Sequence, residues 1–141
     1  MAIPELLLPA HRLRRRLSEG SLRVGTLFER SVERARSIEA LRAFRDLEEP
    51  FGRAAAERSE VRQRRGTWLG PLDGLPIGIK DSFSMRGSVA REGSPVTSSS
   101  PTEQDGPAIA ALRRRGLVPA GRTTMPAYGW KAVTDSPLTG I

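Results

Sequence analysis

Apolar residues in the first third of the chain recur at the spacing of helices. They form two stripes, one through Leu6, Leu7, Leu13 and Leu17 and one through Val24, Leu27, Phe28, Val32 and Ala35. Gly20 lies between the stripes and interrupts the pattern. We therefore expect two helices, with Thr26 as the candidate cap of the second.

The middle of the chain changes from a mixed to a polar and then to an apolar pattern. Residues 40–47 are short and mixed, which indicates a strand, whereas 49–65 are polar and rich in Ala and Arg. The polar segment favours an exposed helix that ends at Gly66. From Gly70, turn residues precede the apolar run 75–80, which predicts a tight turn followed by a buried strand.

The remaining residues indicate a long loop, a helix and a further strand. Ser, Gly, Pro and Thr dominate 82–104, which predicts a long ordered loop. A helix is expected to start at Asp105, with Pro107 in its first turn, and to end at Gly116 before a strand over 117–121. This order predicts an α/β fold, in which N-terminal helices precede part of a parallel or mixed β-sheet with flanking helices.

The strong positive charge raises the question of a nucleic-acid partner. The 141 residues carry a net charge of +7, and 21 of the 23 cations are arginine. These arginines are spread along the chain, and no aromatic residue lies between basic ones in the manner of RNA-binding motifs. We interpret them as solvated helix faces, and a nucleic-acid surface is the minor alternative.

The composition limits the compartment and the chemistry. The chain has no cysteine, which excludes disulfides, thiolate zinc sites and a cysteine nucleophile. It has no apolar run of about 18 residues, and its N-terminal charges follow the first apolar stretch, unlike those of a secretory signal. We expect a soluble cytoplasmic protein without a membrane partner. His11, the only histidine, has no carboxylate near it in sequence and is expected to be exposed.

Lys80 is the main candidate for chemistry in this sequence. It ends an apolar strand in a chain that otherwise uses arginine for its cations. A lysine at a strand end can simply extend its amine to solvent, but arginine would do this equally well. Only lysine can lose its proton in a desolvated site and act as a base. Both interpretations remain open on the residues alone.

Two blocks of sequence resemble the amidase signature family. The first, GPLDGLPIGIKDSFSMRGSVAREGS, shares the family pattern at Gly70, Pro71, Leu72, Gly74, Pro76, Gly78, Lys80, Asp81, Gly87, Gly93 and Ser94. The second begins at Asp105 and continues through ALRRRGLVPAGRTTMPAYGWKAVTDSPLTG. Thr124 and Ala127 depart from the residues that are frequent in the family, which puts substrate preference in doubt. The resemblance extends over 70–140 and is weak in the helical first third.

The resemblance implies an amide hydrolase with a Ser-Ser-Lys triad, in which Lys80 is the proton carrier and no metal or organic cofactor takes part. Both serines and the oxyanion loop belong to a Gly-Ser-rich signature that follows the second block, so we expect an incomplete, inactive piece. We expect residues 1–66 to be an N-terminal helical region and 67–141 the start of the amidase-signature core, together one incomplete domain.

Other residues are weaker candidates for a catalytic or substrate-binding role. Ser98, Ser99 and Ser100 lack flanking glycines, and Ser82 and Ser84 lack an oxyanion partner, so we interpret all five as loop residues. Asp81 is expected to order the turn after the strand rather than to transfer protons. Met125, Tyr128 and Trp130 line a substrate pocket or serve packing; both alternatives remain.

The expected partner is a small-molecule amide substrate, with assembly into a homo-oligomer left open. The resemblance also covers amidotransferase A-type subunits, which act on charged tRNA together with partner subunits. A non-catalytic basic module that binds nucleic acid or protein is the alternative outside the enzymes.

Overall fold

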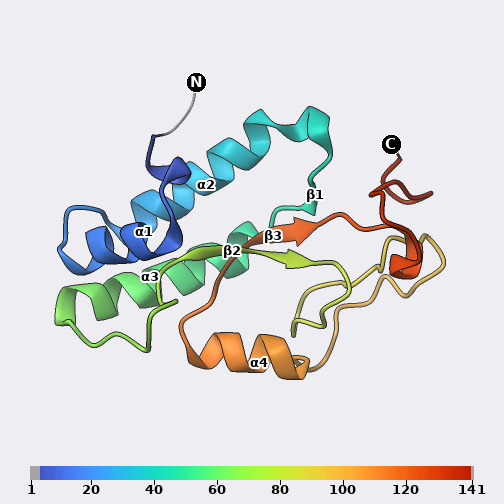
Figure 1. The fold of residues 1–141 in the computed structure, drawn as a ribbon. Coiled ribbons are helices and arrows are strands. Elements are labelled where there is room, and N and C mark those ends of the chain that lie inside the picture. Colours follow the sequence, from blue (N-terminus) through green and yellow to red (C-terminus); the bar gives the residue numbers. More distant parts are fainter. Residues whose placement is uncertain (1–3, 141) are drawn as a thin grey trace.

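A computed structural model describes residues 4–140 of the protein as an α/β fold (Figure 1). Its elements are η1 (Pro4–Leu7), α1 (Ala10–Ser18), α2 (Val24–Ser37), η2 (Glu39–Leu41), β1 (Phe44–Asp46), α3 (Glu49–Arg65), β2 (Pro76–Lys80), α4 (Pro107–Arg114), β3 (Val118–Thr123) and η3 (Ala127–Gly129). The α1–α2 pair lies on one side of the small sheet and α4 on the other. The predicted fold class, with helices leading into part of a mixed sheet, is confirmed.

The sheet has the order β1-β3-β2 and mixed strand directions. β2 runs parallel to β3, and β1 runs antiparallel to it. The central strand β3 is buried over its first five residues and reaches Thr123, two residues beyond the predicted end. β2 lies at an edge, and of its five residues only Ile79 is buried, so the strand is confirmed but its predicted burial is wrong for the other four.

The two apolar stripes of the first third form helices whose side chains enter a common core. Leu17, Leu27 and Phe28 are fully buried there, together with Val118 of β3. Thr26 does not cap α2, because the helix already begins at Val24 and Thr26 is exposed. Side chains of α3 satisfy this helix end instead. The N–H of Val24 donates to Gln63 Oε1 at 3.1 Å, and the N–H of Gly25 donates to Glu60 Oε2 at 3.0 Å.

The helix α3 has the predicted bounds but not the predicted exposure. A stripe of small residues, Gly52, Ala55, Ala56 and Ser59, is buried along it. A Cβ at Gly52 would lie 2.3 Å from the carbonyl oxygen of Pro119 and 2.4 Å from the Phe28 ring. The small side chains therefore allow α3 to approach both α2 and β3 closely, and the expectation of an exposed helix was wrong for this face.

The helix α4 begins two residues later than expected. Gly106 is its N-cap and Pro107 its first residue, whereas Asp105 lies outside the helix. The Asp105 carboxylate accepts the backbone N–H of Arg86 at 2.7 Å and pairs with Arg113 at 2.6 Å. It thereby connects the start of the loop 82–104 to the residue that follows its end, and the loop is irregular as predicted.

A buried carboxylate fixes the turn that leads into β2. Asp73 is fully buried and accepts hydrogen bonds from Ser59 Oγ at 2.6 Å, from two nitrogens of Arg62 at 2.7 Å and from the N–H of Leu69 at 2.9 Å. Burial alone would raise the pKa of Asp73, but the donors outweigh it and hold this pKa below its ordinary value.

Acid should therefore destabilise the protein through Asp73. Because its folded-state pKa is depressed, its contribution is present above the unfolded value of about 4 and is lost as the pH falls through the folded value. We expect Asp73→Asn to lower the free energy of unfolding near pH 7 by about 2 kcal/mol and to flatten its decline in acid. Urea unfolding at several pH values measures both effects. Glu57→Gln, at an exposed position of α3, is the control; equal acid sensitivity of the Asp73→Asn variant and the parent protein would refute this role.

Candidate active site

Lys80 lies where two parallel strands end together. It is the last residue of β2, and its register partner is Thr123, the last residue of β3. The loop 82–104 and the segment after β3 both leave the sheet at this edge. Ligand sites in α/β proteins lie outside the carboxyl ends of parallel strands. Lys80 thus lies where a site is expected.

The Lys80 side chain is exposed and borders a small apolar cleft. The cleft has a volume of about 90 Å³ and is lined by residues of β2 and α4 and by Phe83. Among residues 4–140, no carboxylate lies within ion-pair distance of Lys80, and no serine hydroxyl is hydrogen-bonded to it. Its amine is therefore available to a group that approaches from outside these residues.

Asp81 connects the strand end to the loop 82–104. It is 1% exposed and accepts the backbone N–H groups of Arg91 at 3.2 Å and Gly93 at 3.5 Å. It also forms an ion pair with Arg45 at 3.1 Å. Its own N–H donates to the carbonyl oxygen of Thr123 at 3.2 Å. The predicted ordering role of Asp81 is confirmed, and it folds the loop back onto the end of β2.

A buried ionic network holds the backbone at Phe83, just after Lys80 and Asp81. The fully buried Arg122 donates to Ser88 Oγ at 2.9 Å, to Glu48 Oε1 at 3.2 Å and to the carbonyl oxygen of Phe83. Ser88 Oγ in turn donates to Glu48. Since the N–H of Phe83 donates to the carbonyl oxygen of Lys80 at 3.0 Å, the network reaches the backbone of the candidate base.

Sequence reasoning missed this network because it assigned the arginines to solvated faces. That interpretation is wrong for Arg122 and for Arg45, whose side chain is 13% exposed. The signal was the position of Arg122 inside the otherwise apolar strand Val118–Thr123. A cation in such a place requires partners, because burial of an unpaired charge is costly.

The aromatic residues after β3 differ from Met125 in exposure. Met125 is buried, whereas Tyr128 is 60% and Trp130 76% exposed. Tyr128 and Glu92 have positive φ angles of 54° and 49°, and the N–H of Tyr128 donates to the carbonyl oxygen of Glu92 at 2.8 Å. Such strain in residues other than glycine is common at functional sites. Packing thus explains Met125, and the two exposed rings remain candidates for a substrate pocket.

The candidate serines lie in irregular chain, as expected. Ser98, Ser99 and Ser100 are exposed in the loop 82–104, and Ser82 and Ser84 are exposed near its start. Ser84 uses its carbonyl oxygen to accept the N–H of Gly106 at 2.9 Å. This contact is structural. His11 is exposed, as predicted.

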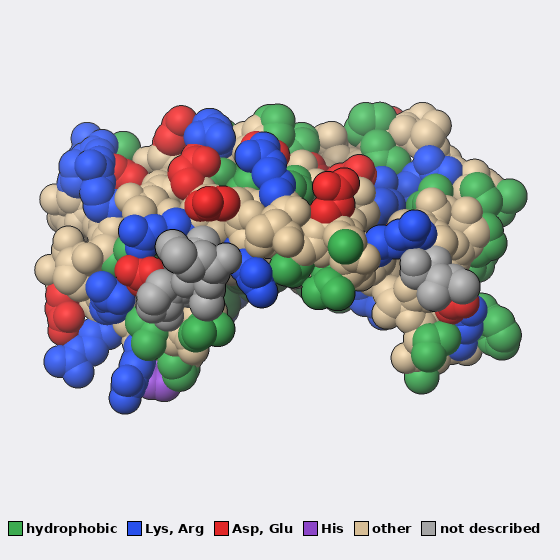
Figure 2. Space-filling model, turned by 90° about the horizontal axis from the view of Figure 1, so that it is seen from above, with side chains coloured by type: hydrophobic (Ala, Val, Ile, Leu, Met, Phe, Trp, Pro, Cys, Tyr) green, Lys and Arg blue, Asp and Glu red, His purple; other side chains and the backbone are tan. Residues whose placement is uncertain are grey.

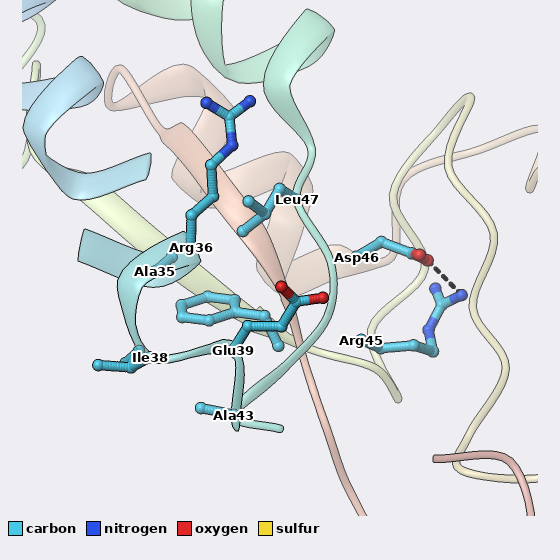
Figure 3. A pocket seen from close by; sticks show the side chains of 9 residues that line it. Ala35, Arg36, Ile38, Glu39, Ala43, Arg45, Asp46 and Leu47 are labelled. Carbon is cyan, nitrogen blue, oxygen red and sulfur yellow. Dashed lines mark ion pairs between the residues drawn. The ribbon is translucent and has the colours of Figure 1, made fainter. Parts of the chain in front are cut away.

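A larger cleft lies away from Lys80. Its volume is about 470 Å³, and it is bordered by the end of α2 and by β1, where Arg45 pairs with Asp46 (Figure 3). The residues of 4–140 that line this cleft include no serine, threonine, histidine or lysine, so the strand end at Lys80 remains the candidate active site.

The charge distribution, the metal-binding groups and the character of the helices add three observations. On the face shown in Figure 2, basic side chains alternate with acidic ones and form no continuous basic stripe. Within the described part of the chain, no three residues among His, Cys, Asp and Glu are grouped to hold a metal ion. None of the helices in residues 4–140 has the length and apolar character needed to cross a membrane.

Comparisons with known proteins agree with these features. Residues 26–141 match the family model described as Amidase. The chain is 33% identical over 87 residues to Amidase 2 of Gibberella moniliformis. The match covers 62% of this chain and 17% of that protein. It is 31% identical over 121 residues to the A-type subunit of the glutamyl-tRNA(Gln) amidotransferase of Chloroflexus aggregans. This second match covers 85% of this chain and 25% of that protein.

A solved structure of an amidase superimposes with a TM-score of 0.85 at 28% identity, over 94% of this chain and 30% of that one. The chain thus spans a quarter or less of the length of the two relatives and about a third of the solved structure. Because the family model covers most of the chain, the protein belongs to the amidase signature family.

Proposed function

We propose that the protein hydrolyses carboxylic amides through an acyl-enzyme, with Lys80 as the base of a Ser-Ser-Lys triad. The observation that carries the proposal is the position of Lys80 at the shared end of β2 and β3, within the motif that resembles the family's catalytic block. A strand end gives the amine a fixed starting point beside the cleft.

In the proposed reaction, Lys80 accepts a proton from one serine, which in turn accepts the proton of the nucleophilic serine. The nucleophile attacks the amide carbonyl, Lys80 returns the proton through the relay to the nitrogen, and the C–N bond breaks to release the neutral amine and leave the acyl-enzyme ester. Water then attacks the ester, releases the carboxylic acid and restores the serine. Both serines and the oxyanion donors belong to a Gly-Ser-rich signature that the 141 residues do not contain.

The surroundings of Lys80 support this role. Asp81 and Arg122 fix the backbone on the carboxyl side of Lys80 through partly buried hydrogen bonds, whereas the amine itself is not neutralised by a carboxylate of residues 4–140. A base must be held in place and yet remain able to exchange its proton. The contacts of Asp81 and Arg122 support the first requirement, and the lack of a carboxylate partner for Lys80 among residues 4–140 supports the second.

An amidotransferase component is the second candidate. It is favoured by the 31% identity to the A-type subunit of a glutamyl-tRNA(Gln) amidotransferase over most of this chain. Such a protein would pass ammonia to charged tRNA in a complex rather than release it. Glutamine-dependent amidation of charged tRNA after addition of partner subunits, without hydrolysis of simple amides, would favour this candidate.

The proposal is tested by following amine release from aliphatic and aromatic amides by the full-length protein. Hydroxylamine should divert the acyl-enzyme to a hydroxamate, and the rate of amine release should stay the same if acyl-enzyme formation limits turnover. Turnover without any hydroxamate would contradict the acyl-enzyme route.

A polypeptide limited to residues 1–141 should show no amide turnover above background. A base without a nucleophile and oxyanion donors has nothing to activate, so its activity should not differ from that of its own Lys80→Ala variant. Ammonia release from both samples provides the measurement. Turnover that disappears with Lys80→Ala would show that these residues already contain a complete catalytic apparatus.

A further inference from the structure

Four arginines line a third cleft, between α3 and α4. The cleft has a volume of about 330 Å³, and its four lining arginines come from three separate segments: Arg58 and Arg62 of α3, Arg86 of the loop 82–104 and Arg113 of α4. Lys80 is not among the lining residues. The cleft is therefore separate from the candidate active site.

Two of the four arginines are held by carboxylates. Arg62 donates to Asp73 through two nitrogens at 2.7 Å, and Arg113 pairs with Asp105 at 2.6 Å. Their side chains are 21% and 30% exposed, respectively. These pairs restrict the guanidinium groups before any ligand arrives, which reduces the entropy that binding must overcome.

The other two arginines leave the cleft with an excess of positive charge. Within residues 4–140, neither Arg58 nor Arg86 has a carboxylate within ion-pair distance. The N–H of Arg86 donates to Asp105 at 2.7 Å, so the backbone of this residue is fixed at the cleft. Four guanidinium groups and two carboxylates thus leave two positive charges uncompensated.

We propose that this cleft binds the phosphate group of a small phosphorylated molecule. A phosphate dianion carries the charge that the cleft lacks, and guanidinium groups bind its oxygens through paired hydrogen bonds. A single carboxylate would neutralise only half of the excess. The lining has no aromatic residue on which a base could stack, which disfavours single-stranded nucleic acid. This binding goes beyond the proposed hydrolysis and does not depend on it.

Calorimetric titration of the full-length protein with inorganic phosphate and with phenyl phosphate, at constant ionic strength, tests the proposal. The double variant Arg58→Ala/Arg86→Ala should weaken both affinities by at least about tenfold. The matched control Arg65→Ala/Arg114→Ala removes two exposed arginines of α3 and α4 that lie outside the cleft and should change the affinities by less than about twofold. If phenyl phosphate binds more tightly than inorganic phosphate, the ligand is an organic phosphomonoester. If inorganic phosphate binds more tightly, the ligand is free phosphate.

Three results would overturn the proposal. The first is that neither phosphate compound binds saturably. The second is that the two double variants weaken the phosphate affinities equally. The third is that the protein binds only an arbitrary DNA duplex, with an affinity that falls steeply as the salt concentration rises. Circular dichroism checks the fold of each variant, and Arg58→Gln/Arg86→Gln replaces the alanine pair if that pair is unfolded. Amidase activity is measured separately, so failure here leaves the proposed hydrolysis untouched.

Discussion

Replacing Lys80 with arginine should abolish amide hydrolysis by the full-length protein, lowering kcat by roughly a thousandfold or more, nearly as much as replacement with alanine. Arginine keeps the positive charge and adds hydrogen-bond donors, but its pKa is too high for it to release a proton and act as a base. A structural cation would tolerate the change, whereas a proton carrier would not. Steady-state kinetics of both variants measure the difference.

The only other lysine of the chain provides the control for this experiment. Lys131 pairs with Asp135 after β3, so Lys131→Arg should keep the ion pair and the activity. Thermal unfolding separates lost chemistry from overpacking by the larger side chain. A well-folded Lys80→Arg enzyme with near-normal kcat would remove Lys80 from the catalytic role.

Replacing Arg122 with methionine should lower the free energy of unfolding by about 3–5 kcal/mol. The change leaves the buried Glu48 carboxylate without its cation and Ser88 without a donor. It also frees the carbonyl oxygen of Phe83, so the start of the loop 82–104 should become more mobile. Urea unfolding gives the energy, and hydrogen exchange at 83–88 reports the loop.

A double variant separates the ion pair from simple loss of packing. Adding Glu48→Leu to Arg122→Met removes the unpaired charge and should recover part of the lost stability. Arg65→Ala, at an exposed arginine of α3, should change stability by less than about 0.5 kcal/mol. A cost below about 1 kcal/mol for Arg122→Met would show that the network adds little.

The sequence predicts elements best where the apolar side chains are large. The stripe through Leu27 and Phe28 predicts α2, because large side chains at helical spacing have one way to be buried together. The apolar run before Lys80 predicts β2, because a short apolar run that follows turn residues is typical of a strand. The position of Lys80 at a strand end could therefore be predicted from local pattern alone.

Features that depend on contacts distant in sequence could not be predicted in this way. The start of α2 is satisfied by Gln63 and Glu60 of α3, which no local pattern around Thr26 reveals. The buried face of α3 consists of small residues that carry little hydrophobic signal, although Gly52 lies against the Phe28 ring. Arg122 is charged and buried, a combination that composition alone assigns to the surface.

The anchoring of the loop 82–104 shows where a reporter group can be attached without disturbing the contacts that fix this loop. Asp81 holds Arg91 and Gly93, and the N–H of Thr102 donates to Ser88 at 2.9 Å, so both flanks of the loop are fixed. Between these flanks, 98–100 is exposed. A short peptide carrying a fluorophore, inserted between Ser99 and Ser100, would extend into solvent, because loop tips tolerate insertions.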